Sequence, residues 1–214
     1  MNEAIFGFLG VLVGACISWI REELKERRLR KRHGMYLAAR VVCVLDEYVE
    51  KCVEVVGDDG TIMGQAAVRD ESGQEYYKPQ VPLPEAPDYP DDVDWKSINS
   101  NLMYRLLALP NTARETDRYI SASSEHAFPP DYEEVFEARG KGYATLGLEA
   151  LQLAKELRKT FKIPQENYVK WNPDWNPGNY FKKETKKVEE RQASRAVSFA
   201  KMHNDLQDRV GDKQ

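Results

Sequence analysis

The chain is poor in the residues that most often build reactive sites, since it has only three cysteines and three histidines. Cys16, Cys43 and Cys52 form no C-x-x-C pair, which leaves a zinc ribbon or a thioredoxin-like site without support. Cys43 and Cys52 lie roughly 13 Å apart along one predicted helix, too far for a mutual disulfide. We therefore expect free thiols of the kind found in a reducing compartment.

Motifs for catalysis are also missing. None of His33, His126 and His203 lies in an H-E-x-x-H or Glu-x-x-His pattern, so the glutamate–histidine pairs of a dinuclear metal bundle are absent. The sequence has no G-x-S-x-G elbow, no phosphate-binding G-x-x-x-x-G-K-[ST] loop and no G-x-G-x-x-G. We expect neither cofactor nor metal, and we predict that the chain is not an enzyme. A net charge of −4 also argues against nucleic acid as a partner.

One long apolar run stands out against this background. Ala4 to Ile20 carry no charge, and residues 21–33 hold seven Lys or Arg. The run covers roughly 25 Å as a helix, the short end for a membrane span. Positive flanks stay in the cytoplasm, so we predict a single-pass protein of the inner or plasma membrane. Its N-terminus is outside, and its C-terminal domain is cytoplasmic.

Three other interpretations compete with a membrane span. A cleaved signal peptide needs a positive segment before the apolar run, and none precedes Ala4. Val13 to Cys16 loosely resemble a lipoprotein attachment site, but Ile17, Trp19 and Ile20 continue the run beyond it. A buried helix of a soluble domain is the third interpretation. The basic residues directly after Ile20 favour the membrane.

Small residues share one side of the predicted span, at a spacing that lets two membrane helices approach closely. Glycine is also simply common in membrane spans, so homodimerisation through this side remains a hypothesis. The small residues are Gly7, Gly10, Gly14 and Ser18. The basic residues after the span set the topology and are candidates for lipid headgroup contact. They are Arg21, Lys25, Arg27, Arg28, Arg30, Lys31 and Arg32.

The rest of the chain is patterned for helices. Apolar residues recur every three or four positions in four segments, at about 21–56, 94–127, 131–162 and 179–209. Pro110 should kink or split the second segment, and the glycines of the third indicate close helix contact or a hinge. The predicted organisation is an anchor at 1–20, a basic juxtamembrane helix at 21–34, a bundle at 35–210 and a tail at 211–214. The bundle contains an acidic, proline-rich insertion at 57–93 and a Trp-Asn-Pro loop at 163–179.

The predicted fold is therefore mainly all-α, a transmembrane helix that continues into an antiparallel four-helix bundle. Residues 61–69 and 74–81 could pair as a small β-hairpin across residues 70–73. The prolines after it indicate an extended crossover. With an up-down-up-down order, both unusual loops lie together at the membrane-distal end, and the turn at 128–130 lies near the bilayer.

Aromatic residues in and beside these loops are the best interaction candidates, because aromatic side chains often anchor protein contacts. The opposite interpretation is that they fold back and seal the end of the bundle, as tryptophans usually do. The candidates are Trp171, Trp175, Tyr168, Tyr180, Tyr89 and Trp95.

Three functions remain open. The first is a membrane-tethered adaptor, sensor or assembly subunit that binds a protein partner. The second is a membrane-active effector, such as a pore-forming or phage-defence component, that oligomerises through the small residues of its span. The third is an enzyme whose site has no recognisable motif.

Overall fold

Four α-helices make up most of the chain in the computed structural model, with almost no strand. The prediction of a mainly all-α helical bundle is confirmed. The helices are α1 (Asn2–Gly57), α2 (Ser100–Glu125), α3 (Glu133–Phe161) and α4 (Pro177–Gly211). The structure describes residues 2–66, 68–69, 73, 75–125, 132–164 and 174–211, with side chains at 14–65, 73, 76–125, 132–164 and 174–203.

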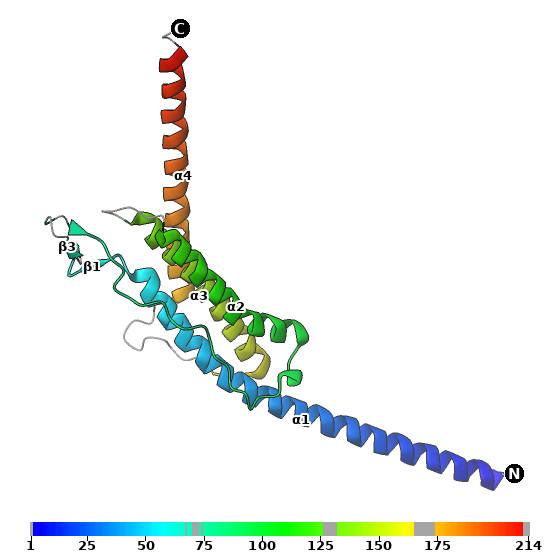
Figure 1. Ribbon diagram of the computed structural model, residues 1–214. Helices are drawn as coiled ribbons and strands as arrows, with labels where there is room; N and C mark the ends of the chain where they lie inside the picture. The colour runs from blue at the N-terminus through cyan, green and yellow to red at the C-terminus, as the bar shows by residue number, and fades with distance from the viewer. Residues whose placement is uncertain are drawn as a thin grey trace.

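Helix α1 is one uninterrupted rod, and only its second half joins the bundle (Figure 1). From residue 14, where the description of side chains begins, almost every side chain up to residue 33 is exposed, and Gly34 is the first buried residue of that stretch. The apolar stripe predicted for this helix is buried, with Leu37 and Cys52 both 0 % exposed. Among the side chains described, from residue 14 onward, no helix is long and apolar enough to cross a membrane. Residues 1–13 of the predicted anchor lie outside that part.

Helix α3 is the central element, because it packs against each of the other three helices. It runs antiparallel to α1: the ring of Phe161 lies against Gly34, and Arg139 binds Asp58 at the other end of the bundle. Glycine allows this packing to be close. A Cβ atom at Gly147 would meet the Phe181 ring of α4 at 2.4 Å. The predicted close contact of the α3 glycines is confirmed at this position.

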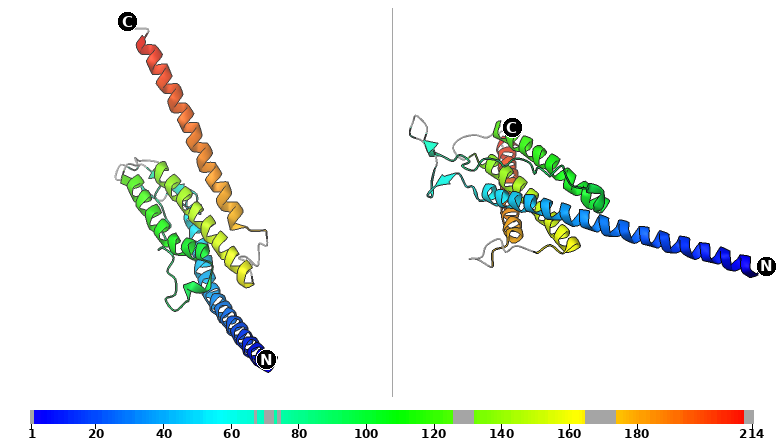
Figure 2. Two further views of the ribbon diagram at one scale, coloured as in Figure 1. Left: turned by 90° about the vertical axis from the view of Figure 1, so that its right-hand side faces the viewer. Right: turned by 90° about the horizontal axis from the view of Figure 1, so that it is seen from below.

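The up-down-up-down order is wrong. Helices α1, α2 and α4 run in one direction and only α3 opposes them, as the two views of Figure 2 show. The predicted antiparallel pairing of α2 with α3 is correct, because Thr116 faces Gly142 while Arg105 reaches Glu149. The predicted placement of both unusual loops at one end fails with the order. Asp58, in the insertion, binds Arg139 at one end of the bundle, whereas Phe161, just before the Trp-Asn-Pro loop, lies against Gly34 at the other end. The turn predicted at 128–130 lies outside the described residues.

The reason is the proline-rich connector, which returns along the whole packed half of α1 before α2 begins (Figure 1). An extended chain rises about 3 Å per residue, twice the rise of a helix, so a short segment covers that length. The connector is attached at both ends. Asp58 accepts the N–H groups of Gln80 and Val81 at 2.9 Å each, and Asp92 accepts the Tyr36 hydroxyl at 2.9 Å.

Two minimal hairpins precede the connector. Strands β1 (Thr61–Ile62) and β2 (Gln65–Ala66) form one, and β3 (Val68–Arg69) pairs antiparallel with β4 (Glu75–Tyr76) in the other. The second matches the hairpin predicted across residues 70–73. The connector ends in a 3-10 turn, η1 (Trp95–Ser97), capped by Asp94.

Helix α2 begins later than predicted and does not break at its proline. Asn99, rather than Asp94, caps it, with its side-chain oxygen accepting the N–H of Asn101 at 2.9 Å. The helix continues through Pro110 to Glu125, so the predicted split does not occur. The apolar stripe of α2 is buried, including Leu106 at 0 % and Ala113 at 1 % exposure.

Helix α4 packs on α3 only along its first half. Phe181 and Val188 are buried, whereas Phe199 and Met202, predicted on the same inner face, are 64 % and 55 % exposed. The second half of the helix rises clear of the bundle (Figure 1). The inner face predicted from spacing is therefore correct near the start of α4 and wrong at Phe199 and Met202, while the side chains of Leu206 and Val210 lie outside the described part.

Candidate functional site

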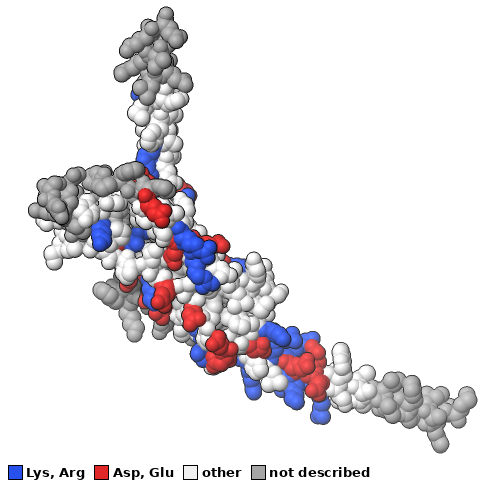
Figure 3. Space-filling model, in the orientation of Figure 1, with Lys and Arg blue, Asp and Glu red and all other residues white. Residues whose placement is uncertain are grey.

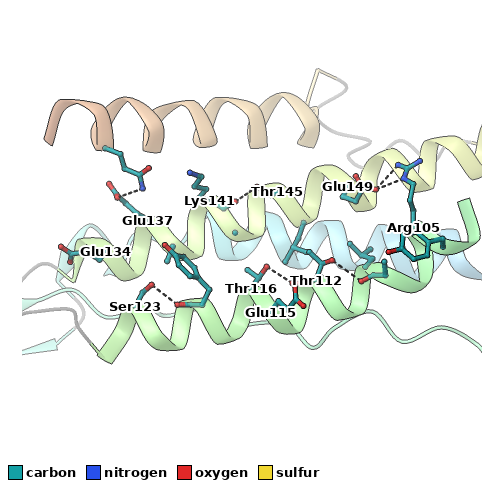
Figure 4. A pocket seen from close by; sticks show the side chains of 18 of the residues that line it. Arg105, Thr112, Glu115, Thr116, Ser123, Glu134, Glu137, Lys141, Thr145 and Glu149 are labelled. Atoms are coloured by element: carbon teal, nitrogen blue, oxygen red, sulfur yellow. Dashed lines mark hydrogen bonds and ion pairs between the residues drawn. The ribbon is translucent and has the colours of Figure 1, made fainter. Parts of the chain in front are cut away.

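A groove of about 1160 Å³ lies between α2 and α4, with α3 as its floor (Figure 4). The floor runs from Glu134 to Glu149, roughly 22 Å at 1.5 Å per residue. The α2 wall carries two exposed aromatic side chains, Tyr104 at 72 % and Tyr119 at 66 % exposure. Gln192 and Arg195 form the α4 wall at one end only. The groove is thus long, narrow and open along most of one side.

Close contacts of glycines set the shape of this groove. A Cβ atom at Gly142 would lie 2.6 Å from the methyl group of Thr116, so α2 approaches α3 as closely as a side chain allows. Gly147 allows an equally close approach of α4 to α3, because the Phe181 ring of α4 packs directly over it. The two walls are therefore fixed to the floor by contacts that Ala would disturb.

Ion pairs fix the end of the groove near Glu149. Arg105 of α2 donates to Glu149 at 3.0 Å and to Glu156 at 2.8 Å. Partial burial opposes the charge of Arg105, but the hydrogen bonds that it donates to both carboxylates outweigh this effect and raise the pKa of the guanidinium. This arginine therefore remains charged and holds α2 against α3.

Glu137 dominates the other end of the groove. It is 3 % exposed, and its Oε2 accepts hydrogen bonds from Arg195 and, at 3.3 Å, from Gln192. Arg195 also contacts Glu133 at 3.1 Å. The second oxygen, Oε1, is buried without a hydrogen-bond partner among the described residues. A buried carboxylate oxygen without a donor is costly, so this end favours a ligand that brings one.

The predicted aromatic candidates form two separate pairs rather than one patch. Tyr89 and Trp95 meet edge to face, with ring centroids 5.6 Å apart, on the connector. Trp175 and Tyr180, at the start of α4, have centroids 5.3 Å apart. Trp171 and Tyr168 lie outside the described residues. Three of the four described rings pack partly buried against the core, while Trp175 is 36 % exposed, so the structure does not bring the candidates together into one binding surface.

The basic residues of α1 divide between two sides of the helix. Four of them line one shallow groove together with Leu24 and Leu29, namely Arg21, Lys25, Arg28 and Arg32. Arg27 belongs to another side and donates to Glu23 at 2.7 Å. Figure 3 shows this charged stretch between the bundle and the uncharged part of α1 nearer the N-terminus.

The small residues of the predicted span are only partly described. Gly14 has open space around it, and Ser18 is exposed. Gly7 and Gly10 lie in the part of α1 whose side chains the structure does not describe.

No family model, curated protein or solved structure matches this chain. The site is therefore interpreted from its own residues. Within the described ranges, no group of three or more His, Cys, Asp or Glu side chains is placed to hold a metal ion.

Sequence reasoning missed the groove and its polar contacts. Asp46 of α1 binds Arg158 of α3 with both oxygens in a largely buried pair, and no motif in the sequence indicates this contact. The groove wall on α2 had a visible signal, because Tyr104 and Tyr119 interrupt the polar face of an otherwise amphipathic helix.

Proposed function

We propose that this chain is a single-pass membrane protein whose cytoplasmic bundle acts as an adaptor, sensor or assembly subunit. It does so by holding a partner helix in the groove between α2, α3 and α4. The groove carries the proposal, because its length and openness fit a helix of about four turns. Exposed Tyr104 and Tyr119 supply aromatic contact area, and the unpartnered Oε1 of Glu137 accepts a donor from the ligand.

Binding rather than catalysis is proposed because both arginines of the groove are paired with glutamates of α3. Arg105 is paired with two glutamates, and Arg195 is paired with Glu133 and Glu137. Such pairs hold three helices in place and leave the open part of the groove mainly apolar, as helix-binding grooves are.

The membrane tether is proposed from the uncharged run Ala4 to Ile20 and the basic residues after it. The uninterrupted helix supports this proposal, because backbone crossing a bilayer must satisfy its hydrogen bonds internally. The N-terminus is placed outside and the bundle in the cytoplasm, at the inner or plasma membrane.

Lipid headgroups are the proposed ligands of the basic side of α1. Its four residues, from Arg21 to Arg32, follow the small residues Gly14 and Ser18 along the same side of the helix. A symmetric pair of spans in contact along this side would bring like charges near each other. We therefore favour anionic lipid over homodimerisation here, and loss of self-association on Gly10→Ile plus Gly14→Ile would reverse that preference.

Fractionation tests the tether. The full chain should enter the membrane fraction with its C-terminus protected from protease in intact cells, and a version lacking residues 1–20 should be soluble and folded. A C-terminus accessible from outside, or lipid attached to Cys16, would contradict the proposed location.

A bulky substitution tests the groove. Thr145 is exposed on the floor of the groove, so the larger side chain of Thr145→Trp should fill the groove. Partner proteins that crosslink to the groove of the unchanged protein should then no longer be captured. Arg114→Trp, on the outer side of α2, is the matched control and should leave capture unchanged. Equal capture by both variants would refute a role for the groove.

A further inference from the structure

Small residues line the groove along α2 and along its floor on α3. They are Ala108, Thr112, Ala138, Gly142 and Thr145. Helices approach closely where residues are small, and an interface reaches the packing density of a protein interior only if the other helix supplies the missing volume. A helix held here therefore needs bulky apolar side chains, three or four positions apart, on the side that faces the groove.

Carboxylates outnumber arginines at the end of the groove near Glu149. Arg105 is the partner of both Glu149, at 3.0 Å, and Glu156, at 2.8 Å. The side chains of both glutamates are more than one-third exposed, so each can accept a further hydrogen bond. One guanidinium cannot neutralise two carboxylates, and this end keeps a negative charge.

The excess of negative charge is larger at the end near Glu137. Burial opposes the charge of Arg195, but three surrounding carboxylates outweigh this effect and raise the pKa of the guanidinium. They are Glu137, Glu133 and Glu134. Glu134 is exposed, and Oε1 of Glu137 is buried with no hydrogen-bond partner among the described residues. Two negative charges and an unused acceptor therefore remain at this end.

The middle of the groove is balanced in charge. Glu115 of α2 and Lys141 of α3 are both exposed there, one residue of each sign. Figure 4 shows them between Glu134 at one end and Glu149 at the other. The unbalanced negative charges thus lie at the two ends of the groove, roughly 22 Å apart.

We propose that the partner is a basic amphipathic helix: it presents bulky apolar side chains to the small residues of the groove and carries Lys or Arg near both of its ends. The inference rests on the proposed function of the groove as a helix-binding site. About 16 residues cover the distance between the acidic ends. A cation at one end donates to Glu134 and Glu137, and a cation at the other donates to Glu149 and Glu156. An acidic helix would place like charges side by side at both ends, which opposes binding.

Three synthetic peptides test this chemistry on the full chain in nanodiscs of phosphatidylcholine, a lipid without net charge. The Lys peptide has Leu at every third or fourth position on one side, Lys near both ends and Ala elsewhere. The Glu peptide has Glu in place of Lys, and the Ala peptide has Ala in place of Leu. Fluorescence anisotropy measures binding, with empty nanodiscs as the blank. The Lys peptide should bind about tenfold more tightly than either of the others, and added salt should reduce its advantage over the Glu peptide.

A reversed charge locates the contact. Glu134→Lys should weaken binding of the Lys peptide about tenfold and strengthen binding of the Glu peptide, with unchanged helical circular dichroism. Glu50→Lys is the matched control, because it makes the same change in charge at an exposed position of α1, which does not line the groove. It should alter neither affinity. Thr145→Trp should abolish binding of the Lys peptide.

Four results would overturn the proposal. The first is binding of the Glu peptide as tight as that of the Lys peptide, and the second is an unchanged affinity of the Lys peptide in Glu134→Lys. The third is equal binding of the Ala peptide, which would show that charge alone attracts these peptides. The fourth is the absence of saturable binding by the Lys peptide.

The proposed function can survive each of these failures. If Thr145→Trp still abolishes capture of a partner protein, the groove is a binding site and only the chemistry of its partner is wrong. If Thr145→Trp changes neither capture nor peptide binding, the groove itself is not a binding site.

Discussion

Adding one methyl group to α3 should change the free energy of unfolding with opposite signs at two glycines that lie seven residues apart. At Gly140 a Cβ atom would meet its nearest neighbour, a methyl of Val188, at 4.0 Å, an ordinary contact. At Gly147 it would meet the Phe181 ring at 2.4 Å. Gly→Ala inside a helix stabilises by about 1 kcal/mol when space is available, because the unfolded chain loses freedom. Overpacking costs about 1–3 kcal/mol.

Gly140→Ala should therefore raise the free energy of unfolding by up to about 1 kcal/mol. Gly147→Ala should lower it by roughly 0–2 kcal/mol, because the overpacking cost exceeds the gain in helix propensity. Urea unfolding of the full chain, followed by circular dichroism at constant detergent, measures both changes. The Phe181 side chain is fully buried, so the lost contact is also visible as increased exposure of α4 to hydrogen exchange.

Relief of the clash provides the decisive control. Phe181→Leu destabilises on its own, because it removes buried ring atoms, but in the Gly147→Ala background it also makes room for the new methyl group. The double-mutant cycle should therefore be non-additive by about 1 kcal/mol or more in the favourable direction. Equal stabilisation by both alanines, or strict additivity with Phe181→Leu, would refute the argument that Gly147 is required by close packing.

Three further predictions concern buried and charged groups. Asp58→Asn should lower the free energy of unfolding by about 3–5 kcal/mol in urea, because it leaves the buried charge of Arg139 without its partner. A loss under about 1 kcal/mol would contradict this prediction. Cys43 should react with a thiol reagent in the native protein at pH 8, whereas Cys52 should react only in denaturant, since burial raises the pKa of its thiol. Hydrogen bonding lowers the pKa of Asp92, so its attachment of the connector to α1 is present above about pH 4 and is lost as the pH falls further. Hydrogen exchange of residues 85–97 should therefore become faster below about pH 4. Asp92→Asn should remove this dependence on pH.

The helices were predictable because their apolar residues repeat at the helical period. Leu37, Leu106 and Leu157 stand on stripes visible in the sequence, and all three are fully buried. The same rule failed at the end of α4, because a periodic stripe shows only that a face is apolar. It does not tell whether the partner of that face belongs to the same chain, and Phe199 illustrates the difference.

Helix direction was not predictable from spacing. The up-down-up-down order assumed that a connector spans only the gap between two helix ends. Here the prolines keep the connector extended, and Asp58 and Asp92 attach its two ends to α1, so the chain reverses before α2 begins. A carboxylate that accepts backbone N–H groups from a distant loop leaves no pattern in a single sequence. The groove was missed for the same reason, since it exists only because α2 and α4 take opposite sides of α3.

The central position of α3 has a consequence for synthesis. The apolar stripe of α1, from Leu37 to Val55, is covered mainly by a helix about 100 residues later in the chain. At a translation rate of about 5–20 residues per second, this stripe waits on the order of 5–20 s for its partner. During that time a helix rich in Val and Leu stays uncovered, and with the proposed tether it would stand next to the bilayer. The nascent chain is therefore a substrate for chaperones, and the packing of α3 on α1 is complete only after Phe161 has emerged.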